Sequence, residues 1–340
     1  MLVSNEVSRR FKLVSALSMV GILFIHSKFI NSRWGEELGS SLYSYISVSV
    51  QYLISEQITR ICVPLFFIIS GYFFYHKYDG TLKSYFILLK KQIKSILIPY
   101  LLWSLTWYVL LNFSNFNFIN FSSLLNGLLY PIPYQFWFLK ILLLCFIISP
   151  IFFIVNQNYP KTTIILLILF YFLDVNNFKL EIYGFGFFCL GGYIRYNDLN
   201  LNKNVYNYLI YIYVISIIIG LLLYVINASD CFYLRVILHK TSILAGLILI
   251  YYYISKGIEC IKFSWDFLLY KQSGFFFFVY AAHEPLLSFL KKIWIQLFSD
   301  SYNLFPYVFL PLIILYMLHL CYMFLEKKIP LVLVFYNGNR

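Results

Sequence analysis

The feature that most constrains this chain is a succession of long apolar runs, which recurs from one end of the sequence to the other. A transmembrane helix needs about 20 mainly apolar residues. Ten runs reach or approach this length, at residues 13–30, 60–76, 95–113, 137–155, 162–174, 182–194, 206–226, 234–255, 274–290 and 305–325. Because the runs are continuous rather than alternating, they favour helices over the strands of a membrane β-barrel. The sequence predicts an all-α, polytopic transmembrane helical bundle with about ten spans, in a single domain covering residues 1–340.

The composition argues against a soluble globular domain. Only 12% of the residues are charged and 61% are hydrophobic, whereas a soluble domain carries about 25% charged residues. The formal net charge of +12 comes from basic residues that punctuate the apolar runs, so we expect contacts with membrane lipids and none with nucleic acid. The six cysteines form no CxxC pair, and we expect neither a disulfide framework nor a metal site. The sequence also lacks a phosphate-loop or dinucleotide motif, so no bound cofactor is expected.

The positions of Lys and Arg predict how the chain is oriented in the membrane. With a cytoplasmic N-terminus, 17 of the 26 basic residues lie on the cytoplasmic side and 8 lie outside, with Lys140 inside a run. This bias follows the positive-inside rule and predicts that both termini are cytoplasmic. The abundance of Asn, Ile, Lys, Tyr and Phe is typical of an AT-rich genome, and we expect a bacterial plasma (inner) membrane.

Ionisable side chains inside apolar runs are costly and are therefore candidates for function. His26 lies 14 residues after Lys12, about 21 Å along a helix and past the middle of the membrane. Two interpretations remain open for His26: a buried structural histidine, or a general base whose pKa near neutrality suits proton transfer.

His283 and Glu284 are adjacent ionisable residues in the run 274–290. Adjacent helical residues point about 100° apart, so the two side chains cannot face one point. Pro285 lacks an N–H and leaves the carbonyl of Ala281 without its helical partner. The pattern predicts either a functional polar site or a structural kink.

Other polar positions have plainer explanations. Lys140 fits a lysine reaching toward the membrane surface, and Ser70-Gly71 fits a close helix contact between small residues. His319 fits a structural histidine in the last run, and His76 fits the membrane interface. The stretch 41–57 is predicted to be an amphipathic helix that lies at the outer interface and does not span the membrane.

Several stretches, in order, match one family. The sequence CVPLFFIISGYFFY (62–75) resembles the second-helix motif of the integral-membrane acyltransferase family 3, in its polysaccharide-modifying branch. SMVGILFIHS (18–27) resembles its first helix, which ends in a histidine, and QFWFLKILLLCFIISPI (135–151) resembles its Trp-Phe-Leu-Arg segment. The resemblance continues in GFGFFCLGGYI (184–194), FFFFVYAAHEPLL (275–287) and EKKIPLVLVFYNGNR (326–340), and so covers essentially the whole chain.

The resemblance implies O-acyl transfer, often of acetyl, from cytoplasmic acyl-CoA as co-substrate. The implied acceptor is a sugar hydroxyl on a surface polysaccharide, exopolysaccharide or glycolipid, with polysaccharide-assembly proteins as possible partners. With this reaction in view, we assign expected roles to the polar residues. The catalytic candidates are His26, His283 and Glu284; the acceptor-binding candidates are Arg60, Lys140, Trp137 and Ser70; the donor-binding candidates are Lys12, Ser15, Lys90, Lys91 and Lys94.

Two motifs depart from the family pattern. The family has an arginine where this chain has Ser15, eleven residues before His26. Lys12 lies one turn away on nearly the same helix face, and we expect its cation to take the place of the arginine. In the Trp-Phe-Leu-Arg segment, Lys140 replaces the arginine and Ile141 stands where an acidic residue is common.

Two other functions remain open. A flippase or exporter of polysaccharide or lipid-linked sugar would need polar groups along a whole path, and the sparse polarity within the runs disfavours it. A non-catalytic relative would have lost transfer together with the altered charges at Ser15 and Ile141.

Overall fold

The computed structural model describes residues 5–30, 41–111, 127, 133–173, 180–197, 202–226, 229–256, 273–298 and 303–338. These residues form helices and no strand. The α-helices are α1 (Asn5–Ser27), α2 (Leu42–Gln51), α3 (Cys62–Lys77), α4 (Leu82–Gln92), α5 (Ile98–Leu111), α7 (Trp137–Asn158), α8 (Pro160–Leu173), α9 (Leu180–Asn197), α10 (Lys203–Val225), α11 (Phe232–Lys256), α13 (Ser273–Phe298), α14 (Leu304–Lys328) and α15 (Pro330–Tyr336). Short π- or 3-10-helical segments are η1 (Tyr52–Ile58), η2 (Thr59–Ile61), η3 (Ile93–Leu97), η5 (Tyr134–Phe136) and η6 (Ser229–Cys231).

The all-helical prediction is confirmed for the described residues, and each apolar run falls mainly on a helix. Seven helical segments in this part of the chain are long and apolar enough to cross a membrane. They are Val7–Ser27, Leu42–Lys77, Leu82–Leu111, Tyr134–Asn158, Lys203–Val225, Phe232–Ser255 and Leu304–Lys328. The other three runs correspond to α8, α9 and α13. The count of ten spans therefore stays a prediction, and so does the side on which the termini lie.

One of these segments is longer than a single span needs. Leu42–Lys77 covers 36 residues, because α2 continues through the π-helical η1 and the 3-10-helical η2 into α3. A π-helical turn changes the register of side chains around the helix axis, and such turns are frequent at functional sites. Here the turn brings Ser55 and Glu56 to fully buried positions.

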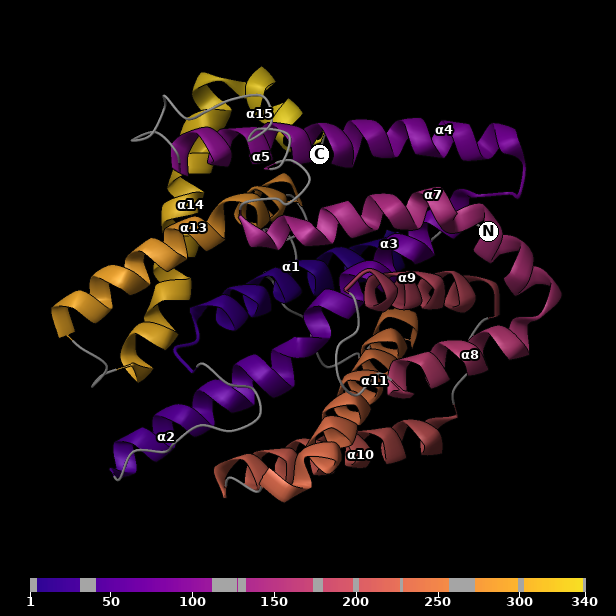
Figure 1. The fold of residues 1–340 in the computed structure, drawn as a ribbon. Coiled ribbons are helices and arrows are strands. Elements are labelled where there is room, and N and C mark those ends of the chain that lie inside the picture. Colours follow the sequence, from indigo (N-terminus) through magenta and orange to yellow (C-terminus); the bar gives the residue numbers. More distant parts are fainter. Residues whose placement is uncertain are drawn as a thin grey trace.

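The helices pack as a bundle with α1 in its interior, where it contacts α3, α13 and α14. Figure 1 shows α3, α7 and α9 side by side, with α4 and α5 along one edge and the α10–α11 pair along the other. The outer faces of α7, α10 and α14 expose large apolar side chains such as Ile151, Tyr211 and Met323. Such faces suit lipid rather than water as their surroundings.

Two glycines bring α3 and α9 into backbone contact. A Cβ added to Gly71 would overlap the carbonyl oxygen of Phe188, and one added to Gly191 would overlap that of Ile68. The crossing is therefore reciprocal, with each helix contributing a glycine against the backbone of the other. The predicted small-residue contact at Ser70-Gly71 is confirmed at Gly71, as expected for helices that pack without a hydrophobic driving force.

Gly71→Ala is expected to destabilise the protein by about 1–3 kcal/mol, since neither backbone can move aside without repacking the helix pair. The measurement is the apparent melting temperature of the purified protein in detergent. Gly186→Ala on α9 is the matched control, because a Cβ at Gly186 meets nothing within 4 Å. Equal melting temperatures for the two variants would contradict the close crossing.

Candidate active site

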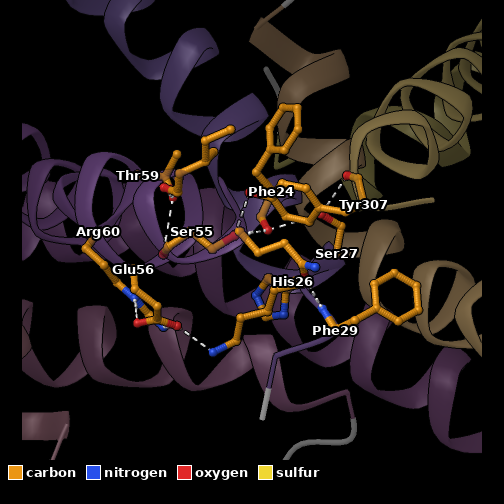
Figure 2. Close-up of polar contacts among 12 residues, drawn as sticks. Phe24, His26, Ser27, Phe29, Ser55, Glu56, Thr59, Arg60 and Tyr307 are labelled. Carbon is orange, nitrogen blue, oxygen red and sulfur yellow. Dashed lines mark hydrogen bonds and ion pairs between the residues drawn. The ribbon is translucent and has the colours of Figure 1, made fainter. Parts of the chain in front are cut away.

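The C-terminal end of α1, which carries His26, is held by side chains from other elements (Figure 2). Ser55 on η1 donates a hydrogen bond to the carbonyl of Phe24 at 2.7 Å. Gln51 accepts one from the backbone N–H of Phe29 at 2.7 Å, and Lys291 on α13 donates to the carbonyl of His26 at 3.4 Å. The last carbonyls of a helix have no partner within the helix, so these contacts stabilise the turn that positions His26.

Tyr307 on α14 joins the same turn from another side. Its hydroxyl lies 2.9 Å from Ser55 Oγ, and its carbonyl accepts from Ser27 Oγ at 3.3 Å. Ser27 and Ser55 are fully buried, so these hydrogen bonds form away from solvent. The end of α1 is thus fixed to η1, α13 and α14 together.

His26 and His283 lie next to each other, although 257 residues separate them in the sequence. Their ring centroids are 5.1 Å apart, with the ring planes at 67°. Nδ1 of the buried His283 lies 3.0 Å from the carbonyl oxygen of Val279 and 2.9 Å from that of Tyr280. Because carbonyl oxygens only accept, Nδ1 must carry the hydrogen, and in the neutral ring Nε2 has a lone pair. This Nε2 is buried and has no hydrogen-bond partner within the described part of the chain.

Pro285 has the local effect that the sequence predicts. α13 continues through Pro285, and the carbonyl of Ala281 takes hydrogen bonds from other helices instead. Trp107 Nε1 on α5 donates to it at 3.0 Å, and Gln135 Nε2 on η5 donates at 3.4 Å. The carbonyl left free by the proline therefore links α13 by hydrogen bonds to α5 and to η5, which precedes α7. These contacts lie next to the turn that carries His283.

Glu284 points elsewhere, as adjacent helical positions require. Its Oε1 accepts a hydrogen bond from Ser288 Oγ at 2.8 Å, and its side chain is half-buried. The structure therefore brings His283, and not Glu284, into ring contact with His26.

A buried carboxylate, Glu56, lies on η1 close to the end of α1 (Figure 2). Its side chain is 0% exposed. Arg60 donates to it from Nε at 2.9 Å and from Nη2 at 2.6 Å, and Lys28 forms a second ion pair with Oε1. Isolated charges are very costly to bury, so Glu56 is tolerated because cations, Arg60 and Lys28 among them, neutralise it.

A separate basic pocket lies where α4, η3 and the C-terminal segment meet. Its volume is about 330 Å³, and its lining residues are Ile87, Lys90, Lys91, Lys94, Ser95 and Gly338. Gly338 has a φ of +67°, and a Cβ there would overlap the carbonyl oxygen of Ser95. Only glycine therefore suits this close approach, which completes one wall of the pocket.

The lysine group Lys90, Lys91 and Lys94 is thus brought together around one cavity, as its proposed role in donor binding requires. Lys12 and Ser15 do not line this cavity. The hydroxyl of Ser15 donates to the carbonyl of Phe11 within α1 at 2.8 Å.

The acceptor-binding candidates are more dispersed. Arg60 belongs to the ion cluster around Glu56, next to the end of α1. Trp137, the first residue of α7, packs on Phe67 with ring centroids 6.2 Å apart. Lys140 on α7 and Ser70 on α3 are half-buried. Neither Trp137 nor Ser70 has a hydrogen bond or ring contact with His26 among the described residues.

Sequence reasoning missed several charged or titratable residues, among them Lys291, which contacts the carbonyl of His26. Lys28 and Glu56 form the ion cluster with Arg60. Arg235 and His239 on α11 are only 3% and 6% exposed. A signal existed for this second pair, since the two residues lie four apart inside an apolar run and share a helix face. Glu56 gave no such signal, because its segment reads as an amphipathic helix with a polar face.

The described residues thus form an apolar helical bundle in which His26 and His283 are in ring contact and a basic pocket lies at the edge. The profile of the acyltransferase 3 family, described as an acyltransferase domain, matches residues 11–326. The chain therefore belongs to this family and is a multi-pass helical membrane protein.

One curated relative points to polysaccharide chemistry. The chain is 26% identical, over 356 residues, to the succinoglycan biosynthesis protein ExoH of Rhizobium meliloti (strain 1021). The alignment covers 98% of this chain and 93% of that protein, which supports the resemblance to the polysaccharide-modifying branch. No solved structure matches the chain significantly.

Proposed function

We propose that this protein is a membrane O-acyltransferase that moves an acyl group, with acetyl the first to test, from acyl-CoA to a sugar hydroxyl. The acceptor would be a surface polysaccharide, exopolysaccharide or glycolipid. The family and the similarity to a succinoglycan biosynthesis protein support acyl transfer on polysaccharide. The observation that carries the proposal is the ring contact between the half-buried His26 and the fully buried His283. The Nε2 lone pair of His283 has no hydrogen-bond partner among the described residues.

In this reaction His26 acts as the general base. It accepts the proton of the sugar hydroxyl while the hydroxyl oxygen attacks the thioester carbonyl. The new C–O bond forms the ester, the C–S bond breaks, and the departing CoA thiolate takes the proton back from His26. The carbonyls of Val279 and Tyr280 fix the tautomer of the neutral His283 ring with the hydrogen on Nδ1, so its Nε2 can accept a hydrogen bond from the protonated His26. Glu284 stays a candidate for orienting this pair, as do Trp137, Lys140 and Ser70 for binding the acceptor.

The donor would bind from the cytoplasmic side. Lys90, Lys91 and Lys94 line a cavity of about 330 Å³, which suits the phosphates of coenzyme A. Lys12 and Ser15 lie on α1, the helix whose last turn carries His26, and we place them along the path of the pantetheine arm. This arrangement requires cytoplasmic termini in a bacterial plasma membrane, and polysaccharide-assembly proteins would be partners.

The test of the function uses two strains that differ only in this gene. We expect the O-acyl ester content of the surface glycan to fall to background without the protein, while glycan export continues. Purified protein in proteoliposomes should also consume acyl-CoA only when an acceptor is present. Movement of glycan without consumption of acyl-CoA would support an exporter instead, and unchanged ester content would indicate a non-catalytic relative.

Replacing the three pocket lysines with glutamine is expected to raise KM for acyl-CoA by about tenfold, since charge-assisted contacts to phosphate are lost. The effect should shrink at high salt, because the lysines are solvent-exposed. Steady-state transfer kinetics give the KM. Lys83→Gln is the matched control, since Lys83 is an exposed lysine of α4 that does not line the pocket. An unchanged KM in the triple variant would exclude the pocket as the donor site.

A further inference from the structure

The ion cluster formed by Lys28, Glu56 and Arg60 has a composition that packing alone does not explain. Replacing a buried ion pair by apolar residues is often neutral or even stabilising, so a helical membrane protein gains little stability from such a cluster. Glu56 is completely buried, whereas the side chains of Lys28 and Arg60 are 22% and 21% exposed. The carboxylate lies at the bottom of the cluster, and the cations form its accessible side.

Glu56 fixes the orientation of the Arg60 guanidinium. Arg60 uses Nε and Nη2 to bind the two carboxylate oxygens of Glu56. A guanidinium has five N–H donors in one plane, so the N–H groups of Nη1 and the second N–H of Nη2 are left over. No other hydrogen bond or ion pair of Arg60 occurs within the described part of the chain. This edge has the geometry that binds a carboxylate or a phosphate with two parallel hydrogen bonds.

The cluster lies beside the proposed general base. Lys28 follows His26 by two residues, and the Nζ of Lys291 contacts the backbone carbonyls of both His26 and Lys28. Lys291 also lies 4.8 Å from the ring centroid of Phe29. Three cations therefore surround the end of α1. An anion held by Arg60 and Lys28 would place its neighbouring groups next to the imidazole of His26.

We propose that Arg60 and Lys28, oriented by Glu56, form an anion-binding subsite, and that the acceptor of acyl transfer carries a carboxylate or phosphate close to the reacting hydroxyl. This inference rests on the proposed function and narrows its acceptor from sugars in general to acidic ones. Arg60 and Lys28 act as substrate-binding residues, and Glu56 is a positioning residue that acts through them.

The test compares matched acceptors with the full-length protein in nanodiscs and acetyl-CoA as donor. The first pair is methyl glucuronide and methyl glucoside, which differ in a carboxylate. The second pair is a sugar joined to an isoprenyl chain through a phosphate and the same sugar joined to the isoprenyl chain without the phosphate. We expect the wild-type protein to prefer the charged member of one pair, and that pair identifies the anion as carboxylate or phosphate. Arg60→Gln should lower the ratio of kcat/KM for charged over neutral acceptor by about tenfold or more.

Two controls keep this result interpretable. Arg60→Gln leaves Glu56 paired with Lys28, so the variant should fold, and size-exclusion chromatography checks this. Lys292→Gln removes an exposed cation of α13 next to Lys291. This second variant should keep the wild-type ratio of kcat/KM for charged over neutral acceptor. Direct binding of the same four probes, measured by a fluorescence shift without acetyl-CoA, gives a readout that does not depend on transfer.

The possible outcomes distinguish a failure of the proposed anion-binding subsite from a failure of the proposed acyltransferase function. Transfer with no preference for charge, or a ratio that Arg60→Gln does not change, would overturn the subsite and leave the acyltransferase standing. Charge-selective binding that depends on Arg60, without any transfer, would support the subsite and overturn the proposed function. Absence of both charge-selective binding and transfer would overturn both.

Discussion

His26→Ala is expected to reduce acyl transfer by at least about 100-fold, because general-base catalysis contributes 10²–10⁴-fold to rate. The expected loss is in kcat rather than in KM, since His26 is proposed to act on the reacting proton and not on the phosphates of the donor. The measurement is ester formation from acyl-CoA by protein in proteoliposomes at equal amounts of folded enzyme. The O-acyl ester content of the glycan in cells carrying the variant should fall to the level of the strain without the protein.

His319→Ala is the matched control for this prediction. His319 is also a histidine of an apolar helix, and its ring lies 5.3 Å from that of Phe275 on α13, so its loss removes an imidazole from the bundle without affecting the histidine pair. We expect it to retain transfer. If His26 and His283 act as one unit, the double alanine variant should lose little more than His26→Ala alone. Full activity of His26→Ala would refute the proposed role of the pair as catalyst.

The helices of this fold were predictable because each depends on local sequence. Apolar runs of nearly 20 residues define helices in a membrane whatever their neighbours are. The effect of Pro285 on the carbonyl of Ala281 was equally predictable, because a missing N–H is a property of one residue. The partners that satisfy this carbonyl, Trp107 and Gln135, were not, since they come from distant segments.

The candidate site was predictable only where the chemistry of one residue identifies it. A histidine such as His26 or His283 stands out in an apolar run, but their 5.1 Å separation depends on how α1 packs against α13. Glu56 was missed because its segment was expected at the outer interface, separate from the following span. In the structure a π-helical turn joins α2 to α3 in one continuous helix and brings Glu56 inside. The pairing with Lys28 then depends on tertiary contact, which local periodicity does not reveal.

Glu56→Gln is expected to destabilise the protein by about 2–4 kcal/mol. Removing one partner of a buried ion pair costs about 3–5 kcal/mol because the remaining charge is uncompensated, and we lower this range since Lys28 and Arg60 are partly exposed. The measurement is the apparent melting temperature in detergent. Because Gln keeps the size of Glu, a fall in stability can be assigned to the charge rather than to a cavity.

A triple variant tests whether the ion cluster serves stability or binding. Glu56→Leu combined with Lys28→Met and Arg60→Met removes all three charges and keeps similar volumes, so its melting temperature should return close to that of the wild type. Its preference for an acidic acceptor should nevertheless be lost, because neither Arg60 nor Lys28, the two cations of the proposed subsite, remains to bind the anion. Recovery of both stability and charge preference would mean that the cluster does not recognise the acceptor. Recovery of stability alone would mean that the charges are kept for binding, and that Glu56 is buried in order to hold two cations beside His26.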